Sequence, residues 1–195
     1  MAVSKQQSKE KIQEAQKLGI QYFGENKVQE AEQKKDIFDP SSELHMIGHL
    51  QSNKAKKAVE IFDVIQTIDS LKIADRINRY AKAINKRQRI YCQINIANDV
   101  MKTGFNKNEI HAHIFDIHKM SNLSLEGIMT ILPININIES TENYYNETRI
   151  LKNKISNMIN KNLDLSMGMS SDYIVAIKCG ATIVRVGTKL FGTRQ

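Results

Sequence analysis

Short apolar runs alternate with longer amphipathic stretches from the first residues of the chain to the last. The apolar runs predict eight β-strands, at residues 2–4, 22–24, 44–48, 64–67, 89–96, 125–130, 164–166 and 183–187. The amphipathic stretches predict helices at residues 8–18, 28–35, 53–62, 71–84, 107–120, 141–158 and 172–178. Strict alternation of this kind indicates a parallel sheet, because each pair of parallel strands needs a helical crossover.

Eight such units favour a closed (β/α)8 barrel of the TIM type. A doubly wound open sheet is the alternative, but its usual signature, a GxGxxG motif after the first strand, is absent from the sequence. The chain has only two prolines and no linker rich in serine and glycine, so nothing marks a domain boundary. We therefore expect residues 1–195 to form a single domain.

The composition fits a folded domain and narrows the functional classes. The 195 residues are 41% hydrophobic, which is enough for a buried core. The net charge is +7, from 28 Lys and Arg against 21 Asp and Glu, but the basic residues are spread along the whole chain. A general compositional bias explains this spread better than a nucleic-acid-binding patch, which would gather the cations on one face.

Two further features concern the cellular compartment. Cys92 and Cys179 stand alone, without a CxxC motif or a Cys/His cluster, and are expected to be buried, reduced thiols. No window approaches the roughly 18 consecutive apolar residues of a membrane span, and the first residues lack the charged and apolar regions of a signal peptide. The sequence therefore predicts a cytoplasmic protein.

A phosphate site is predicted at the end of the barrel. Active sites of TIM barrels lie at the C-terminal ends of the strands, and phosphate is often held by the loops after strands seven and eight. In this chain those loops are residues 166–172 and Gly187-Thr188, which are rich in small and hydroxyl residues, and a helix opens near Ser171-Asp172. The alternative is that Ser170 and its neighbours only cap a helix and that Gly187 only forms a turn.

Two cations also stand at informative places. Lys5 follows the first strand, where a lysine with a lowered pKa can form a Schiff base with a carbonyl compound; the alternative is a solvated surface amine. Arg185 alternates with Val184 and Val186 and so points to the opposite face of its strand. Inside the barrel it would need a partner, and the alternative is a structural ion pair.

The histidines do not follow the spacing of a metal site. For His45 and His49, we expect one to line the pocket and the other to pack within the strand. His111, His113 and His118 fall on a predicted helix and are interpreted as surface or packing residues.

Seven ordered blocks of sequence carry a resemblance to a known family. The blocks are Ala2-Val3-Ser4-Lys5, Phe23-Gly24-Glu25-Asn26 with Val28-Gln29-Glu30, His45-Met46-Ile47-Gly48-His49-Leu50-Gln51-Ser52-Asn53-Lys54, Lys102-Thr103-Gly104-Phe105, Gly127-Ile128-Met129-Thr130, Leu165-Ser166-Met167-Gly168-Met169-Ser170, and Val184-Arg185-Val186-Gly187-Thr188 with Phe191-Gly192. Together they closely resemble the pyridoxal phosphate homeostasis proteins, also called the proline synthetase co-transcribed family. The match runs in order from Ala2 to Arg194.

The resemblance implies a barrel like the N-terminal domain of alanine racemase, holding pyridoxal 5′-phosphate (PLP). Lys5 matches the family's Schiff-base lysine. Arg185 matches an arginine that faces the pyridine nitrogen, and Asn26 matches a residue beside the ring.

The resemblance also assigns residues around the rest of the cofactor. Ser170, Gly187 and Thr188 match positions that hold the phosphate. They lie in the loops after strands seven and eight, where TIM barrels often bind phosphate. Lys102 matches a secondary lysine near the pocket entrance, which the family uses in handing the cofactor on.

The function implied is to bind, buffer and deliver PLP, to PLP-dependent apo-enzymes among others, by a monomer with no established turnover. An arginine at the pyridine nitrogen disfavours the ring proton, so the cofactor would stabilise carbanions weakly. An amino-acid racemase is the second hypothesis, weakened by the lack of an assigned acid and base and of room for a second domain. A nucleic-acid-binding module is the third.

The chain departs from the family pattern at two places. Leu44 stands where the family commonly has tryptophan, a packing change that should leave the site intact. The helix that normally precedes the first strand is missing, and a barrel of this type usually needs more than about 200 residues. We therefore expect either that the true start lies upstream of Met1 or that the first strand is poorly shielded.

Overall fold

The computed structural model describes residues 1–192, so the end of the family resemblance at Arg194 lies outside the described residues. The strands are β1 (Ala2–Val3), β2 (Tyr22–Glu25), β3 (Glu43–Met46), β4 (Val64–Ile68), β5 (Gln88–Asn95), β6 (Phe105–Asn106), β7 (Leu123–Thr130), β8 (Asp164–Met169) and β9 (Ile183–Arg185). The helices are α1 (Lys9–Lys17), α2 (Val28–Lys34), α3 (Ala55–Ile61), α4 (Leu71–Ala83), α5 (Ile110–His118), α6 (Ile138–Ile159), α7 (Tyr173–Lys178) and α8 (Thr188–Phe191), with 3-10 turns η1 (Lys35–Ile37) and η2 (Ser52–Lys54).

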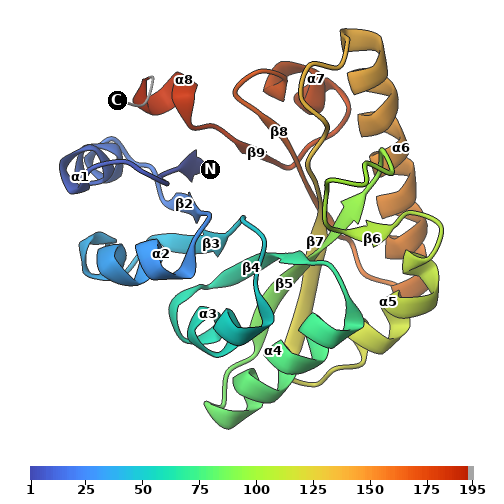
Figure 1. Ribbon diagram of the computed structural model, residues 1–195, viewed down its shortest axis with the longest axis horizontal. Coiled ribbons are helices and arrows are strands. Elements are labelled where there is room, and N and C mark those ends of the chain that lie inside the picture. The colour runs from blue at the N-terminus through green and yellow to red at the C-terminus, as the bar shows by residue number, and fades with distance from the viewer. Residues whose placement is uncertain (193–195) are drawn as a thin grey trace.

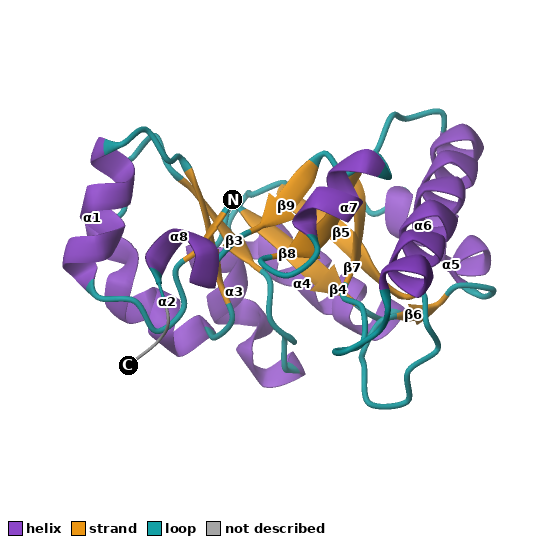
Figure 2. Cartoon of the chain, turned by 90° about the horizontal axis from the view of Figure 1, so that it is seen from above, coloured by secondary structure: helices purple, strands orange, loops and turns teal. Residues whose placement is uncertain are grey.

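Eight of these strands form a parallel barrel in the order β1-β2-β3-β4-β5-β7-β8-β9. Hydrogen bonds close the ring where the chain ends meet: the Val3 amide donates to the Val186 carbonyl at 2.9 Å, and the Val186 amide donates to the Met1 carbonyl at 3.0 Å. Figures 1 and 2 show the strands inside and the helices around them. The predicted (β/α)8 barrel is confirmed, and the open-sheet alternative is wrong.

The predicted elements differ from the structure mainly at their ends. The seventh predicted strand, residues 164–166, continues to Met169 in β8, so most of the predicted phosphate loop is strand. Gly168 permits this path, because its φ is +93° and a Cβ there would lie 2.5 Å from the Cβ of Ala176. The short β6 and α8 were not predicted, because two and four residues are too few to show a period.

The core lies between the barrel and its helices. The helix α4 is typical: Ser70 caps it by accepting a hydrogen bond from the Ile73 amide, and Ile73, Ala74, Ile77 and Ala81 form its buried face. Ile84, at the end of the predicted helix, is exposed. Cys92 and Cys179 are buried and free, as predicted. Within the described part of the chain, no helix is long and apolar enough to cross a membrane.

The expectation that the first strand is poorly shielded is wrong. Ala2 is 1% exposed and packs in the same core cluster as Ile12 and Ala15 of α1. The reason is that the helix following a strand packs over that strand, so α1 covers β1 from the outside. Leu44, in place of the family's tryptophan, is also buried in this cluster.

Candidate functional site

The C-terminal ends of the parallel strands bring the predicted cofactor residues to one mouth of the barrel. Lys5 follows β1, Asn26 follows β2 and Ser170 follows β8, while Gly187 and Thr188 follow β9. Residues that are as far apart in sequence as 5 and 188 therefore share one end of the barrel.

Lys102 belongs to the loop that joins β5 to β6, at this same end. Two side chains of β5 pin the loop: Asn95 Nδ2 donates to the Asp99 carbonyl at 2.8 Å, and Gln93 Nε2 donates to the Thr103 carbonyl at 2.8 Å. Lys102 therefore lies at the same end of the barrel as Lys5 and Asn26, and its place at a pocket entrance stays a prediction.

Ser170 joins the ends of β8 and β9. Its Oγ accepts hydrogen bonds from the amides of Gly187 at 3.2 Å and Lys189 at 3.5 Å. The N-cap of the following helix is Asp172, the last residue of the predicted capping cluster, whereas Ser170 binds the end of β9. The hydroxyl instead lies among the amides that open α8, a group of donors suited to an oxyanion.

The turn that carries Lys5 is held against β2. The Ser4 amide donates to the Gly24 carbonyl at 3.0 Å, and the Gln7 amide closes the turn on the Ser4 carbonyl at 3.1 Å. Lys5 is partly buried in this turn, and its role as a Schiff-base lysine stays a prediction.

Asn26 is positioned by a close backbone contact. A Cβ on Gly48 would lie 2.2 Å from the Asn26 carbonyl oxygen, so only glycine fits there. His49, the next residue, lies at the same mouth, half exposed, with Nδ1 3.2 Å from Asp69 Oδ2. His45 is buried within β3, so one histidine packs and the other lies at the mouth, as expected.

Arg185 is an almost fully buried cation. It is 3% exposed, and its guanidinium donates to Ser166 Oγ and to the Thr130 carbonyl, both at 2.7 Å. Burial lowers the pKa of Arg185 to about 10, although Tyr145 and Asp172 act in the opposite direction. Among residues 1–192 no carboxylate forms an ion pair with it, so the alternative of a structural ion pair is wrong.

A chain of hydrogen bonds runs from Arg185 through the interior of the barrel. Ser166 Oγ, which accepts from Arg185, donates to Gln66 Oε1 at 2.7 Å, and Gln66 Nε2 lies 3.0 Å from His45 Nδ1. Since the amide oxygen of Gln66 accepts, its nitrogen must donate, and the proton of His45 is placed on Nε2. All four side chains are buried. This chain of hydrogen bonds orients the guanidinium from the interior of the barrel, on the side away from the mouth.

Sequence reasoning missed this chain. The signal was present as polar residues inside apolar strands, such as Gln66 within Val64–Ile68 and Ser166 within Asp164–Met169. The sequence does not show which of these polar residues are in contact, because β4 and β8 are not neighbours in the sheet and contact each other only across the barrel.

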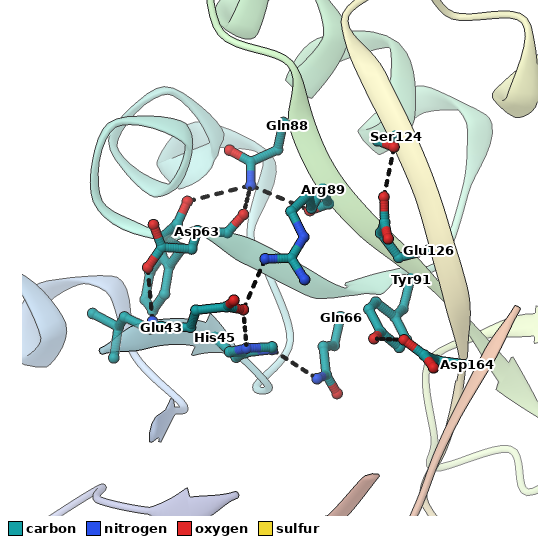
Figure 3. Close-up of polar contacts among 12 residues, drawn as sticks. Glu43, His45, Asp63, Gln66, Gln88, Arg89, Tyr91, Ser124, Glu126 and Asp164 are labelled. Atoms are coloured by element: carbon teal, nitrogen blue, oxygen red, sulfur yellow. Dashed lines mark hydrogen bonds and ion pairs between the residues drawn. The ribbon is translucent and has the colours of Figure 1, made fainter. Parts of the chain in front are cut away.

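The chain of hydrogen bonds from Arg185 ends at His45, in a polar cluster near the opposite, N-terminal end of the barrel (Figure 3). His45 Nε2 lies 3.3 Å from Glu43 Oε2, which also pairs with Arg89 Nη1 at 2.8 Å. Tyr91 donates to Asp164 at 2.8 Å. A hollow of about 380 Å³ opens here, and burial lowers the pKa of His45 to about 3. This hollow lies at the starts of the strands, away from the mouth.

The remaining histidines lie on α5, outside the barrel. The His113 ring packs on Phe105 with centroids 5.8 Å apart, and His118 ends the helix in an exposed position. The interpretation of these histidines as packing or surface residues is confirmed. Within residues 1–192, no group of three His, Cys, Asp or Glu could hold a metal ion.

Comparison with known proteins agrees with this architecture. The family model of the alanine racemase N-terminal domain matches residues 1–195. The pyridoxal phosphate homeostasis protein of Synechocystis is 37% identical over all of this chain and 90% of its own length. That of Haemophilus influenzae is 38% identical over all of this chain and 84% of its own length.

Solved structures add the fold. PipY of Synechococcus elongatus, in a structure with PLP bound, is 35% identical, with a TM-score of 0.92 over 98% of this chain and 91% of its own. The alanine racemase of Clostridium difficile is 18% identical, with a TM-score of 0.85 over 98% of this chain and 51% of its own, a likeness of fold alone. The full-length family match and the relatives above 30% identity show that the chain belongs to the pyridoxal phosphate homeostasis protein family, built on the alanine racemase N-terminal barrel.

Proposed function

We propose that residues 1–195 form one domain that binds PLP at the C-terminal mouth of the barrel, as a Schiff base on Lys5. The observation that carries the proposal is Arg185, a guanidinium buried without a carboxylate partner among residues 1–192 and oriented by neutral acceptors. An unpaired buried cation is costly, so its retention is explained by an electron-rich ligand atom at the site.

Arg185 suits a pyridine nitrogen in particular. A guanidinium only donates hydrogen bonds, so it satisfies an unprotonated ring nitrogen and opposes its protonation. Since Ser166 and Gln66 hold it from the other side, it is oriented before the ligand arrives. When bound, PLP supplies a reactive aldehyde and an electron-withdrawing ring, here in its weaker, unprotonated form.

The phosphate would lie over the ends of β8 and β9. Ser170 would offer its hydroxyl proton and Thr188 its backbone amide at the opening of α8, while the Gly187 amide holds the Ser170 oxygen in place. These donors are neutral, so they would hold an anion in a way that permits release as well as binding.

Lys5 would make the covalent link. In its neutral form the Lys5 amine would hold PLP as a Schiff base, a link that water reverses. Asn26 would lie beside the ring, and Lys102, on the loop at the mouth, would accept the cofactor on its way out.

The proposed role is storage and delivery and not turnover. The protein would act as a cytoplasmic monomer that limits free aldehyde and passes PLP to apo-enzymes. The curated relatives named above are homeostasis proteins, and the weak electron sink set by Arg185 supports a role without catalysis.

The test is reconstitution of the purified protein with PLP, followed by borohydride reduction and peptide mass spectrometry. We expect a yellow protein with a pyridoxyl group on Lys5, loss of the absorbance in Lys5→Ala, and retention in Lys102→Ala. A colourless protein that takes up no PLP would overturn the proposal. Exchange of an amino acid's α-hydrogen with solvent well above the rate with free PLP would favour the racemase hypothesis instead.

A further inference from the structure

Lys34, the last residue of α2, lies beneath the turn that carries Lys5. Its Nζ donates to the Ser4 carbonyl at 3.0 Å, and it pairs with Glu30 Oε1 at 2.7 Å and Glu25 Oε1 at 3.3 Å. Lys34 is 9% exposed, which is rare for a lysine. Glu25 and Glu30 stand in one of the sequence blocks above without an assigned role.

The same cluster holds both peptide groups that flank Lys5. The Ser4 carbonyl precedes Lys5 and accepts from Lys34, while the Gln6 amide follows it and donates to Glu30 Oε1. The Ser4 hydroxyl also donates to Glu25 Oε1 at 2.7 Å. The backbone groups on both sides of Lys5 are therefore hydrogen-bonded to this cluster of one lysine and two glutamates.

The backbone at this turn needs such support. Gln6 has a φ of +58°, a left-handed conformation that costs a non-glycine residue free energy and persists when its surroundings impose it. The bond from the Gln6 amide to Glu30 is one such constraint. The direction in which the Lys5 side chain leaves the strand therefore depends on the cluster.

Stability alone explains the cluster poorly. Glu25 is fully buried, its Oε2 has no hydrogen-bond partner, and burial raises its pKa despite the neighbouring Ser4 and Lys34. A buried ion pair often contributes no more than a well-packed apolar pair of the same volume. Burying these charges costs desolvation free energy, and their hydrogen bonds go to the backbone on either side of Lys5. Such a cluster is suited to positioning the Lys5 side chain.

We propose that Lys34, together with Glu25 and Glu30, positions Lys5 for its reaction with the aldehyde. The inference rests on the proposed function, in which Lys5 carries the cofactor. These are positioning residues, because they act through the turn at residues 4–6.

The test compares Lys34→Met, Lys34→Arg and the double variant Glu25→Gln/Lys34→Met with wild type. The double variant removes the buried carboxylate together with its cation and so remains a folded test if Lys34→Met unfolds. Lys57→Met is the matched control, because Lys57 also bridges two glutamates, Glu32 and Glu60, but on the exposed face of α3. Circular dichroism and urea midpoints establish folding.

Two readouts are used. The first is the rate at which Schiff-base absorbance forms on adding PLP. The second uses protein without PLP: reductive methylation by formaldehyde and cyanoborohydride, with Lys5 scored against the exposed Lys72 by mass spectrometry. We expect both rates at Lys5 to fall about tenfold in Lys34→Met and in the double variant. Lys34→Arg should recover part of the loss, and Lys57→Met should match wild type.

Folded Lys34 variants with wild-type rates in both readouts would overturn the inference. Failure of the proposed function has a different signature, since wild type itself would then form no Schiff base on Lys5. The methylation readout needs no PLP and still decides in that case: an unchanged Lys5 to Lys72 ratio in the folded variants contradicts positioning, and a lowered ratio supports it.

Discussion

The amide of Gly187 donates a hydrogen bond to Oγ of Ser170 at 3.2 Å, and this contact joins the ends of the last two barrel strands. The two residues are 17 positions apart in the sequence. Their contact brings the Ser170 hydroxyl to the opening of α8, at the corner of the mouth where we propose that the phosphate binds.

Ser170→Ala should weaken binding of PLP by about tenfold, because one hydrogen bond to a charged group is lost. Pyridoxal, which lacks the phosphate, should bind with nearly unchanged affinity. Fluorescence or absorbance titration with both compounds measures the difference. Ser171→Ala, at the exposed next position, is the control, and equal losses for PLP and pyridoxal in Ser170→Ala would contradict the assignment.

Gly48→Ala should destabilise the protein by about 2 kcal/mol, because its Cβ would overlap the carbonyl of Asn26 and force a backbone shift. Gly187→Ala should change the free energy of unfolding by less than about 1 kcal/mol, since its Cβ would find Val3 at an ordinary 3.4 Å. Urea unfolding of both variants checks the contrast. Equal stability would show that Gly48 is not sterically required.

The stability of the protein should depend on pH through His45. Its pKa is about 3 in the folded state, against 6.5 for an unperturbed histidine, so the unfolded chain binds the proton first. Stability is therefore fully present above about 6.5 and is lost as the pH falls towards about 3, by about 1.4 kcal/mol per pH unit from this group.

Urea unfolding of wild type and His45→Gln from pH 7 to pH 4 measures this dependence. Other groups contribute to both proteins equally, so the difference between the two curves isolates His45. The gap should narrow as the pH falls. A constant gap over the whole range would mean that His45 takes up its proton in the folded state as easily as in the unfolded one.

Gln66→Leu should cost about 2 kcal/mol, because it leaves buried polar atoms of Ser166 and His45 without their partner. Adding His45→Leu should cost less in this background than in wild type, since the two side chains share one hydrogen bond. A double-mutant cycle by urea unfolding gives the coupling. Strict additivity would show that the interior chain does not act as a unit.

Gln66→Leu should also affect the binding of PLP, because Gln66 belongs to the chain of hydrogen bonds that orients Arg185. In folded Gln66→Leu, Ser166 loses the acceptor of its hydroxyl proton, so Arg185 is held less firmly from behind. PLP should bind more weakly than in wild type, and the absorbance titration used for Ser170→Ala measures it. Unchanged affinity in the folded variant would restrict the chain to a role in stability.

The sequence alone determined the fold class and the end of the barrel that carries the candidate site. Eight apolar runs with helical stretches between them leave few arrangements that bury every strand, and residues following strands necessarily share one end of a parallel barrel. Lys5, Ser170 and Arg185 could therefore be named from their place in the strand pattern and from the family resemblance.

Only the tertiary structure decided which side chains meet. Ser166 and Gln66 are 100 residues apart and touch across the barrel, and Lys34 reaches back 30 residues to the Ser4 carbonyl. Local patterns in the sequence record whether a residue faces the barrel interior, but not which interior residue stands opposite. That pairing depends on the tilt and stagger of the strands, which are set when the barrel closes at Val3 and Val186.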